Sequence, residues 1–202
     1  MDLSRPLAVI TPTLDAPVLA VLARSGLSLS GREVHRLAGT GSASGVHKVL
    51  RRLVRQGIVI ADARPSETLY ELNREHLAAE AVDRIVRIPE TLIDHLRHAL
   101  RSWVPAPRHA SAFRSFARGE AGGDSDVDLL LVRPARAAAS WEDGVLELQG
   151  QVRAMTGNAL EVLEWSLSEL RAQRRTSLWR QLLSDSILLA GQPLERVVST
   201  AR

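Results

Sequence analysis

Two aspartates separated by one residue, Asp126 and Asp128, have the spacing in this chain best suited to metal chemistry. In a β-strand the side chains at i and i+2 point to the same face, so both carboxylates would lie together. The run Val127–Val132 around Asp128 is apolar enough to be buried. Carboxylates at the end of a buried strand repel each other unless a cation lies between them, and Mg²⁺ prefers such ligands. For an isolated Asp-x-Asp pair, the favoured interpretation is a solvated turn before an ordinary strand.

The residues around these aspartates form a longer pattern, AFRSFARGEAGGDSDVDLLLV, at positions 112–132. An apolar run leads to a Ser, an Ala-Arg-Gly-Glu sequence and a polar turn, and the pattern ends in Ser-Asp-x-Asp-Leu. In order and spacing it resembles the signature of the polymerase-beta-like nucleotidyltransferase superfamily, specifically its small bacterial "minimal" members. The matching residues are Phe113, Ser115, Ala117, Arg118, Gly119, Glu120, Ser125, Asp126, Asp128 and Leu129.

By this resemblance, Asp126 and Asp128 bind two Mg²⁺ or Mn²⁺ ions, one holding a triphosphate and the other activating the attacking hydroxyl. The family carries a third carboxylate on a later strand. The sequence Leu160–Leu163 aligns with that strand, so Glu161 is the candidate for completing the second metal site or accepting the proton. Glu is one methylene longer than the family's Asp. Glu164, expected on the opposite face, is the less favoured alternative.

The nucleotide-binding residues implied by the resemblance lie before the aspartates. Ser115 and the turn after it would hold phosphate oxygens at the start of a helix. Ser125 is also a candidate nucleotide-binding residue. The family has Gly where this chain has Arg114, because the backbone there comes close to the triphosphate. Arg114 adds bulk, yet its planar fork suits phosphate oxygens, so it is also a candidate. The implied substrate is an NTP, with ATP as the first candidate, and the acceptor is unknown.

Basic residues are concentrated in the first third of the chain. Positions 32–64 carry seven Lys or Arg and two acids, whereas positions 105–202 carry twelve of each. A localised basic patch is the electrostatic footprint of a nucleic-acid-binding module. The same excess is also compatible with a solvated helix face.

Apolar spacing in the first third predicts helices near 14–25, 30–39 and 42–57, followed by strands at 58–60 and 68–72. Ser30 starts a capping box and Ser42 can cap the third helix. This pattern resembles a bacterial winged helix-turn-helix, whose third helix enters the DNA major groove. Such a module can also bind proteins, which is the alternative. The candidate contacts to double-stranded DNA are Ser42, Ser44, His47, Lys48 and Arg51 on the helix and Arg64 in the turn between the strands.

The expected fold class is α+β. We expect a winged helix-turn-helix domain at 1–72, a helical connector at 73–104 and a small α/β nucleotidyltransferase domain with a mixed sheet at 105–202. The connector could pack on either domain or form the seam of a homodimer. After the strand that contains Asp128, the sequence pattern predicts a helix at 137–155, a strand at 159–165 and a last strand at 187–190.

Composition places loose limits on the environment. The 202 residues contain no Cys, which excludes disulfides and Cys-based zinc sites and fits a cytoplasmic protein. We expect no membrane association, because no apolar run approaches the roughly 20 residues that cross a bilayer. The first residues do not read as a signal peptide either.

Two functional hypotheses follow. In the first, the protein is an enzyme that transfers a nucleotide to an unknown acceptor, and its first domain delivers it to DNA or a partner. In the second, it is a DNA-binding regulator whose nucleotidyltransferase-like domain is weak or inactive and binds a ligand or partner. Retention of Asp126, Asp128 and Ser115 favours the first hypothesis, and Arg114 and Glu161 favour the second.

Overall fold

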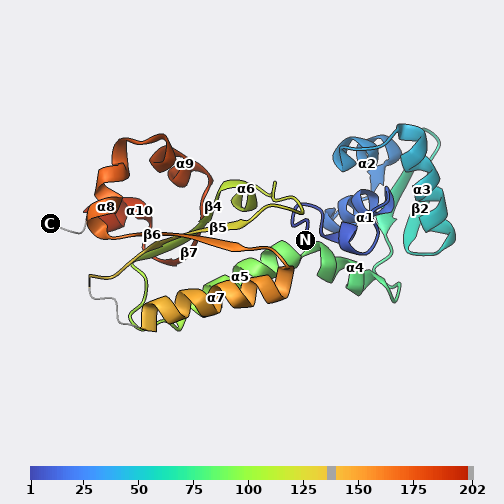
Figure 1. The fold of residues 1–202 in the computed structure, drawn as a ribbon. Helices are drawn as coiled ribbons and strands as arrows, with labels where there is room; N and C mark the ends of the chain where they lie inside the picture. Colours follow the sequence, from blue (N-terminus) through green and yellow to red (C-terminus); the bar gives the residue numbers. More distant parts are fainter. Residues whose placement is uncertain (136–139, 200–202) are drawn as a thin grey trace. The chain divides into compact units, whose positions relative to one another are not determined.

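The computed structural model describes residues 1–135 and 140–199 (Figure 1). The chain divides into two compact units. We call Arg5–Ile88 the N-terminal unit and Met1–Ser4 with Pro89–Arg202 the C-terminal unit. Each contains its own sheet, one of three strands and one of four. None of the helices in the described ranges combines the length and apolar character needed to cross a membrane.

The N-terminal unit contains the three helices and the hairpin that the apolar spacing predicts. A further two-residue strand pairs with the hairpin, so that the antiparallel sheet has the order β1-β3-β2. This strand is too short to produce an alternating pattern in the sequence. The elements are η1 (Pro6–Val9), α1 (Asp15–Arg24), β1 (Leu29–Ser30), α2 (Gly31–Ala38), α3 (Ala43–Arg55), β2 (Val59–Ala63), β3 (Thr68–Leu72) and α4 (Ala79–Val86).

Both predicted helix caps of this unit are confirmed. The Ser30 side chain accepts a hydrogen bond from the backbone N–H of Glu33, and the Glu33 carboxylate accepts one of 2.8 Å from the Ser30 N–H. The Ser42 hydroxyl accepts from the N–H of Gly45 at 3.1 Å. These side chains satisfy N–H groups that have no partner within the first helical turn, and they fix where α2 and α3 begin.

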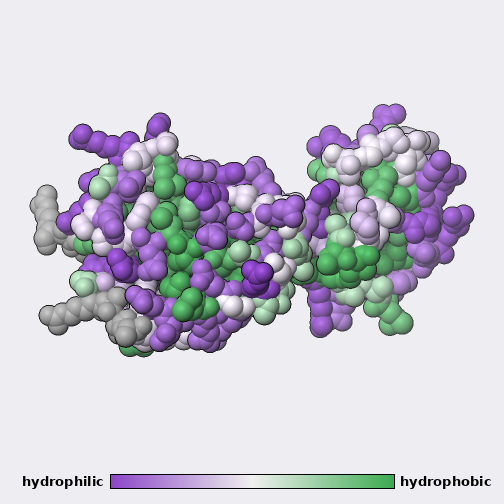
Figure 2. Space-filling model, in the orientation of Figure 1, coloured by the Kyte–Doolittle hydropathy of each residue, from purple (hydrophilic) through white to green (hydrophobic). Residues whose placement is uncertain are grey.

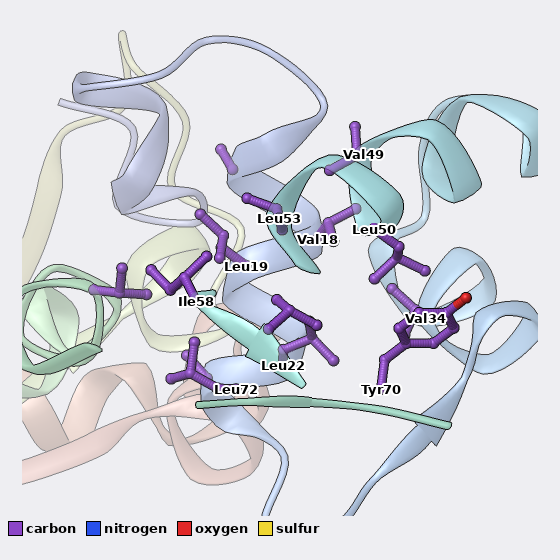
Figure 3. Close-up of a cluster of buried hydrophobic side chains, with 14 of the residues drawn as sticks. Val18, Leu19, Leu22, Val34, Val49, Leu50, Leu53, Ile58, Tyr70 and Leu72 are labelled. Carbon is purple, nitrogen blue, oxygen red and sulfur yellow. The ribbon is translucent and has the colours of Figure 1, made fainter. Parts of the chain in front are cut away.

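Helix α3 is strongly amphipathic. Its outer side is covered by hydrophilic side chains (Figure 2). Its inner side packs into the core of the N-terminal unit, where Leu50 and Leu53 lie among side chains of α1 and the sheet such as Val18, Leu22 and Tyr70 (Figure 3). Burial of this apolar stripe holds α3 in place and leaves its polar side free.

The C-terminal unit has a four-stranded sheet with the order β6-β5-β4-β7. Strands β5 and β6 are parallel and the other pairs are antiparallel, so the predicted mixed sheet and α+β class are confirmed. The predicted start of the helix at 137 lies outside the described residues. The elements are α5 (Ile88–Arg101), β4 (His109–Phe113), α6 (Arg114–Ala117), β5 (Val127–Val132), α7 (Ser140–Thr156), β6 (Leu160–Trp165), α8 (Leu167–Ala172), η2 (Gln173–Arg175), α9 (Ser177–Asp185), β7 (Ile187–Gly191) and α10 (Leu194–Ser199).

Helices cover both faces of this sheet (Figure 1). One face packs against α8, α9 and α10 through a cluster that includes Leu130 and Val132 of β5. The opposite face meets α7, since Trp141 Nε1 donates to Glu164 Oε2 at 2.7 Å. Residues alternate between faces along a strand, so Asp128 lies on the face of Leu130 and away from α7.

Candidate active site and candidate nucleic-acid interface

Two neighbouring strands position Asp128 and Glu161. In the parallel pair of β5 and β6, Asp128 and Glu161 are register partners, and so are Leu130 and Leu163. Register partners of adjacent strands lie on the same face, about 4.8 Å apart along the sheet. Asp128 is buried and Glu161 is exposed on the edge strand. The register therefore places Glu161 beside Asp128 on one face of the sheet, and Glu164 faces the other way.

Asp126 lies in the turn before β5, because the strand begins at Val127. Its side chain is exposed, in contrast to the buried Asp128. Ser125 braces this turn from within, since its hydroxyl accepts a hydrogen bond from the N–H of Gly122 at 3.0 Å. In this structure the Ser125 side chain thus contacts the protein backbone.

Asn158 holds the same turn from outside. Its Nδ2 donates to the backbone oxygen of Ser125 at 2.8 Å, and its Oδ1 accepts from the ammonium group of Met1 at 2.8 Å. The backbone N–H of Ser4 also donates to the Ala121 oxygen at 2.9 Å. The first four residues therefore tie down the acidic turn. No local sequence pattern indicates this, because the partners are far apart along the chain.

Arg114 forms the corner between β4 and α6. Its φ of 58° lies in the left-handed region, and in the part of the chain described by the structure it is the only non-glycine residue with positive φ. Its Nη1 donates to Asp128 Oδ1 at 2.6 Å, and its Cζ lies 5.2 Å from the centre of the Phe113 ring. Ser115 follows in α6, which has only four residues. Such a short helix has little macrodipole to offer an anion.

Arg118 and Glu120, the charged pair of the Ala-Arg-Gly-Glu sequence, lie beside each other after α6. Arg118 Nε donates to Glu120 Oε2 at 2.8 Å, and Arg118 Nη1 is 4.0 Å from Asp185 Oδ2. Arg118 therefore connects Glu120, in the turn after α6, with Asp185 at the end of α9.

The carboxylates do not fit a divalent metal site in this arrangement. Within residues 1–135 and 140–199, no group of three or more His, Cys, Asp or Glu side chains is placed to hold a metal ion. Asp128, a metal ligand by resemblance, is hydrogen-bonded to the guanidinium of Arg114. Mg²⁺ requires a near-octahedral shell of oxygens, and a cationic donor on one of these oxygens competes with it.

A buried His–Ser pair on β4 was not singled out by sequence reasoning. His109 Nδ1 donates to the backbone oxygen of Gln192 at 2.8 Å, and its Nε2 then accepts from the Ser111 hydroxyl at 2.8 Å. Burial lowers the pKa of His109 below its ordinary value, and the hydrogen bond to Gln192 opposes this only in part. The imidazole is held neutral with both nitrogens satisfied, which is a structural arrangement and offers no free nucleophile.

The candidate DNA contacts lie at the start and on the outer side of α3. Ser42, Ser44, His47, Lys48 and Arg51 are all exposed. The two serines also contact each other, with their hydroxyl oxygens 3.1 Å apart.

Two other arginines of this unit are paired with acids. Arg64 lies in the turn between β2 and β3, and its Nε donates to Asp62 Oδ2 at 2.9 Å. Arg52 forms an ion pair with Asp15 of α1 and is directed toward the body of the unit. Among the described residues, Lys48 and Arg51 form no ion pair, whereas Arg52 and Arg64 are paired with acids, and the sequence does not show this difference.

Comparisons with known proteins find only weak similarity. No protein-family model matches the chain, and no curated protein matches it by sequence. Among solved structures, a toxin–antitoxin crystallised with AMP-PNP is 17% identical with a TM-score of 0.39, covering 54% of this chain and 82% of that chain. A mutant of the toxin–antitoxin MntA-HpeT is 14% identical with a TM-score of 0.38, covering 54% and 81%.

A third solved structure, human N-acetylserotonin methyltransferase in complex with SAM, is 18% identical with a TM-score of 0.29. It covers 49% of this chain and 30% of that chain. These comparisons assign the chain to no family. Their TM-scores are too low to carry an argument about function, so the functional reasoning rests on the residues of this chain.

Proposed function

We propose that the protein is a DNA-binding regulator whose C-terminal unit is a nucleotidyltransferase-like domain with little or no turnover. The exposed basic side of α3 carries the first part of this proposal. Lys48 and Arg51 are exposed one turn apart, and among the described residues neither forms an ion pair. Lys and Arg side chains that are free of acids are available to neutralise phosphates.

The surroundings of α3 support the same reading. The helix has thirteen residues and is held by an apolar inner face, so it can present its outer face as a rigid unit. Ser42 and Ser44 lie at its N-terminal end, where a helix in the major groove reaches base edges. In the winged helix-turn-helix that we propose, the turn between β2 and β3, which carries Arg64, would be the wing. We propose both the winged helix-turn-helix fold of this unit and its contact with DNA.

Salt-dependent binding to DNA tests this part. Fluorescence anisotropy with fragments from around the protein's own gene should show affinity that falls steeply between about 50 and 200 mM salt. Replacing Lys48 and Arg51 together by Ala should reduce the magnitude of the slope of log K against log salt by about 0.9 for each lost phosphate contact. Arg84→Ala is the matched control, because Arg84 is exposed on α4 and paired with Glu80 at 2.7 Å.

A wild-type protein that fails to bind DNA even at low salt would contradict the DNA-binding proposal. The protein-interaction alternative would then replace it. Equal loss of affinity in the Arg84 control would mean that net charge, and not the face of α3, drives the association.

The nucleotidyltransferase-like part rests on the pattern at 112–132 and on the strand register. Asp128 and Glu161 face the same side of adjacent strands, and Ser115 follows the corner after β4. The proposal of weak turnover rests on one contact, the hydrogen bond from Arg114 to Asp128. This bond engages the carboxylate that the resemblance assigns to metal binding. Arg114 also places a side chain where the backbone would have to approach a triphosphate.

Incubation of the protein with radiolabelled NTPs, Mg²⁺ or Mn²⁺ and a cell lysate tests this part. We expect transfer by the wild type to be weak or no greater than transfer by the variant with Asp126 and Asp128 both replaced by Ala. Strong labelling that disappears in the double variant would establish the protein as an active nucleotidyltransferase, which is the first hypothesis drawn from the sequence.

A further inference from the structure

The corner at Arg114 combines an unfavourable backbone conformation with a favourable side-chain contact. A positive φ is rarely adopted by residues with a Cβ, and it persists only where the surroundings hold it. At 58°, Arg114 has this conformation, although Gly would adopt it freely. Contacts of the Arg114 side chain must therefore help to hold this backbone conformation.

The side chain of Arg114 is directed to a carboxylate that needs a cation. Asp128 has a side chain only 11% exposed, and its register partner Glu161 places a second carboxylate on the same face. Carboxylates at such positions disfavour each other's charge. The guanidinium of Arg114 approaches from the side of β4, where Phe113 is the register partner of Asp128 and also lies under the Arg114 Cζ. The cation is thus held by an acid and an aromatic ring.

We propose that the Arg114 guanidinium is the resident counter-ion of Asp128 and stands where a divalent metal ion would have to bind. The site then balances its negative charge without metal. The inference deepens the nucleotidyltransferase-like part of the proposed function and rests on it for the assignment of Asp128 as a metal-ligand position. It follows from the 2.6 Å contact and from the lack of a three-ligand group among the described residues.

Manganese binding by the full-length chain, without nucleotide, tests the proposal. Free Mn²⁺ is measured by electron paramagnetic resonance during titration of wild type, Asp128→Asn, Arg114→Gly and the combined variant. We expect wild type and Asp128→Asn to bind Mn²⁺ alike. Arg114→Gly should bind Mn²⁺ more tightly by on the order of tenfold, because removal of a cation at hydrogen-bond distance frees the carboxylate. This gain should be lost when Asp128→Asn is added.

Two further variants make the result specific. Arg118→Ala removes a neighbouring Arg that pairs with Glu120, and it should not increase Mn²⁺ binding. Arg114→Asn removes the charge with a residue that tolerates positive φ, and it replaces the Gly variant if that variant does not fold. Mn²⁺ binding by wild type that depends on Asp128, or no gain in either neutral Arg114 variant, would overturn the proposal.

The titration and the transfer assay fail independently. Because no NTP is present, Mn²⁺ uptake reports only on whether Arg114 occupies the metal position. Strong wild-type transfer with no Asp128-dependent Mn²⁺ uptake would refute weak turnover and leave the counter-ion assignment standing. Asp128-dependent Mn²⁺ uptake by the wild type, without nucleotide transfer, would refute the counter-ion assignment and leave the proposal of weak turnover standing.

Discussion

Replacing Arg114 by Gly and by Ala separates the contribution of its side chain from the contribution of its backbone. Both variants lose the hydrogen bond to Asp128 and leave this carboxylate without its cation. Only Gly relieves the left-handed conformation at φ 58°, because Ala keeps a Cβ. We therefore expect the Gly variant to be more stable than the Ala variant.

The magnitudes follow from exposure and geometry. A hydrogen bond to a charged group contributes about 1.5–3 kcal/mol, and the 55% exposure of the Arg114 side chain places this one near the lower end. In the Ala variant, the free energy of unfolding should be lower than in the wild type by about 1–2 kcal/mol. Replacing Ala by Gly at this position removes the cost of the left-handed conformation, roughly 1–2 kcal/mol. The greater freedom of Gly in the unfolded chain offsets about 0.4–1 kcal/mol of this gain in stability. The free energy of unfolding of the Gly variant should therefore be higher than that of the Ala variant by about 1 kcal/mol.

Urea unfolding followed by tryptophan fluorescence measures this difference in the relevant unit. The four tryptophans are Trp103, Trp141, Trp165 and Trp179, and all belong to the C-terminal unit. The signal therefore reports the unfolding of the unit that contains Arg114. Asp128→Asn complements the pair, because it removes the charge of the acceptor and leaves the Arg114 backbone in place.

Equal stability of the two variants, or a more stable Ala variant, would refute this reasoning. The corner at Arg114 would then have no strain to relieve, and its positive φ would not be a property of the folded chain in solution. Arg118→Ala serves as a control for loss of a nearby Arg, and its partly exposed pair with Glu120 should contribute about 0–1 kcal/mol.

Three further predictions follow. The lowered pKa of His109 means that the unfolded chain binds more protons below its ordinary pKa of 6.5, so the free energy of unfolding should fall as pH drops below that value. The contribution of His109 to the slope of the free energy of unfolding against pH should be at most about 1.4 kcal/mol per pH unit, measured by tryptophan fluorescence. This contribution should be absent in His109→Gln. Gly191→Ala should destabilise the C-terminal unit by about 3 kcal/mol or more in urea unfolding, because its Cβ would lie 2.3 Å from the backbone oxygen of Arg108 at a φ of 74°. Asp62→Ala should release Arg64 for phosphate and steepen the salt dependence of DNA binding by up to about 0.9, and an unchanged slope would place Arg64 outside the interface.

The sequence determined the local structure of the N-terminal unit well. Helices α2 and α3 begin where Ser30 and Ser42 predict, because a cap acts within four residues and leaves a direct trace in the sequence. Apolar spacing likewise predicted a helix at 42–57, where α3 lies. The register of Asp128 with Glu161 could be expected only through the resemblance, since strand pairing joins residues that are distant along the chain.

The tertiary structure decided the state of the candidate site. The resemblance identifies Arg114 as a departure from the family's Gly, but it does not say whether the Arg114 side chain points to solvent, to phosphate or to an acid. Its direction depends on the corner after β4 and on the position of β5, which bring the guanidinium to Asp128 across fourteen residues of sequence.

The same holds for contacts between the ends of the C-terminal unit. Asn158 joins the Met1 ammonium to the acidic turn at Ser125, and His109 is buried against the backbone of Gln192. Caps and apolar periodicity depend on neighbours along the chain, so the sequence determines them directly. Ion pairs and hydrogen bonds between distant segments depend on how strands and turns assemble, and only the folded chain shows which acids and bases meet.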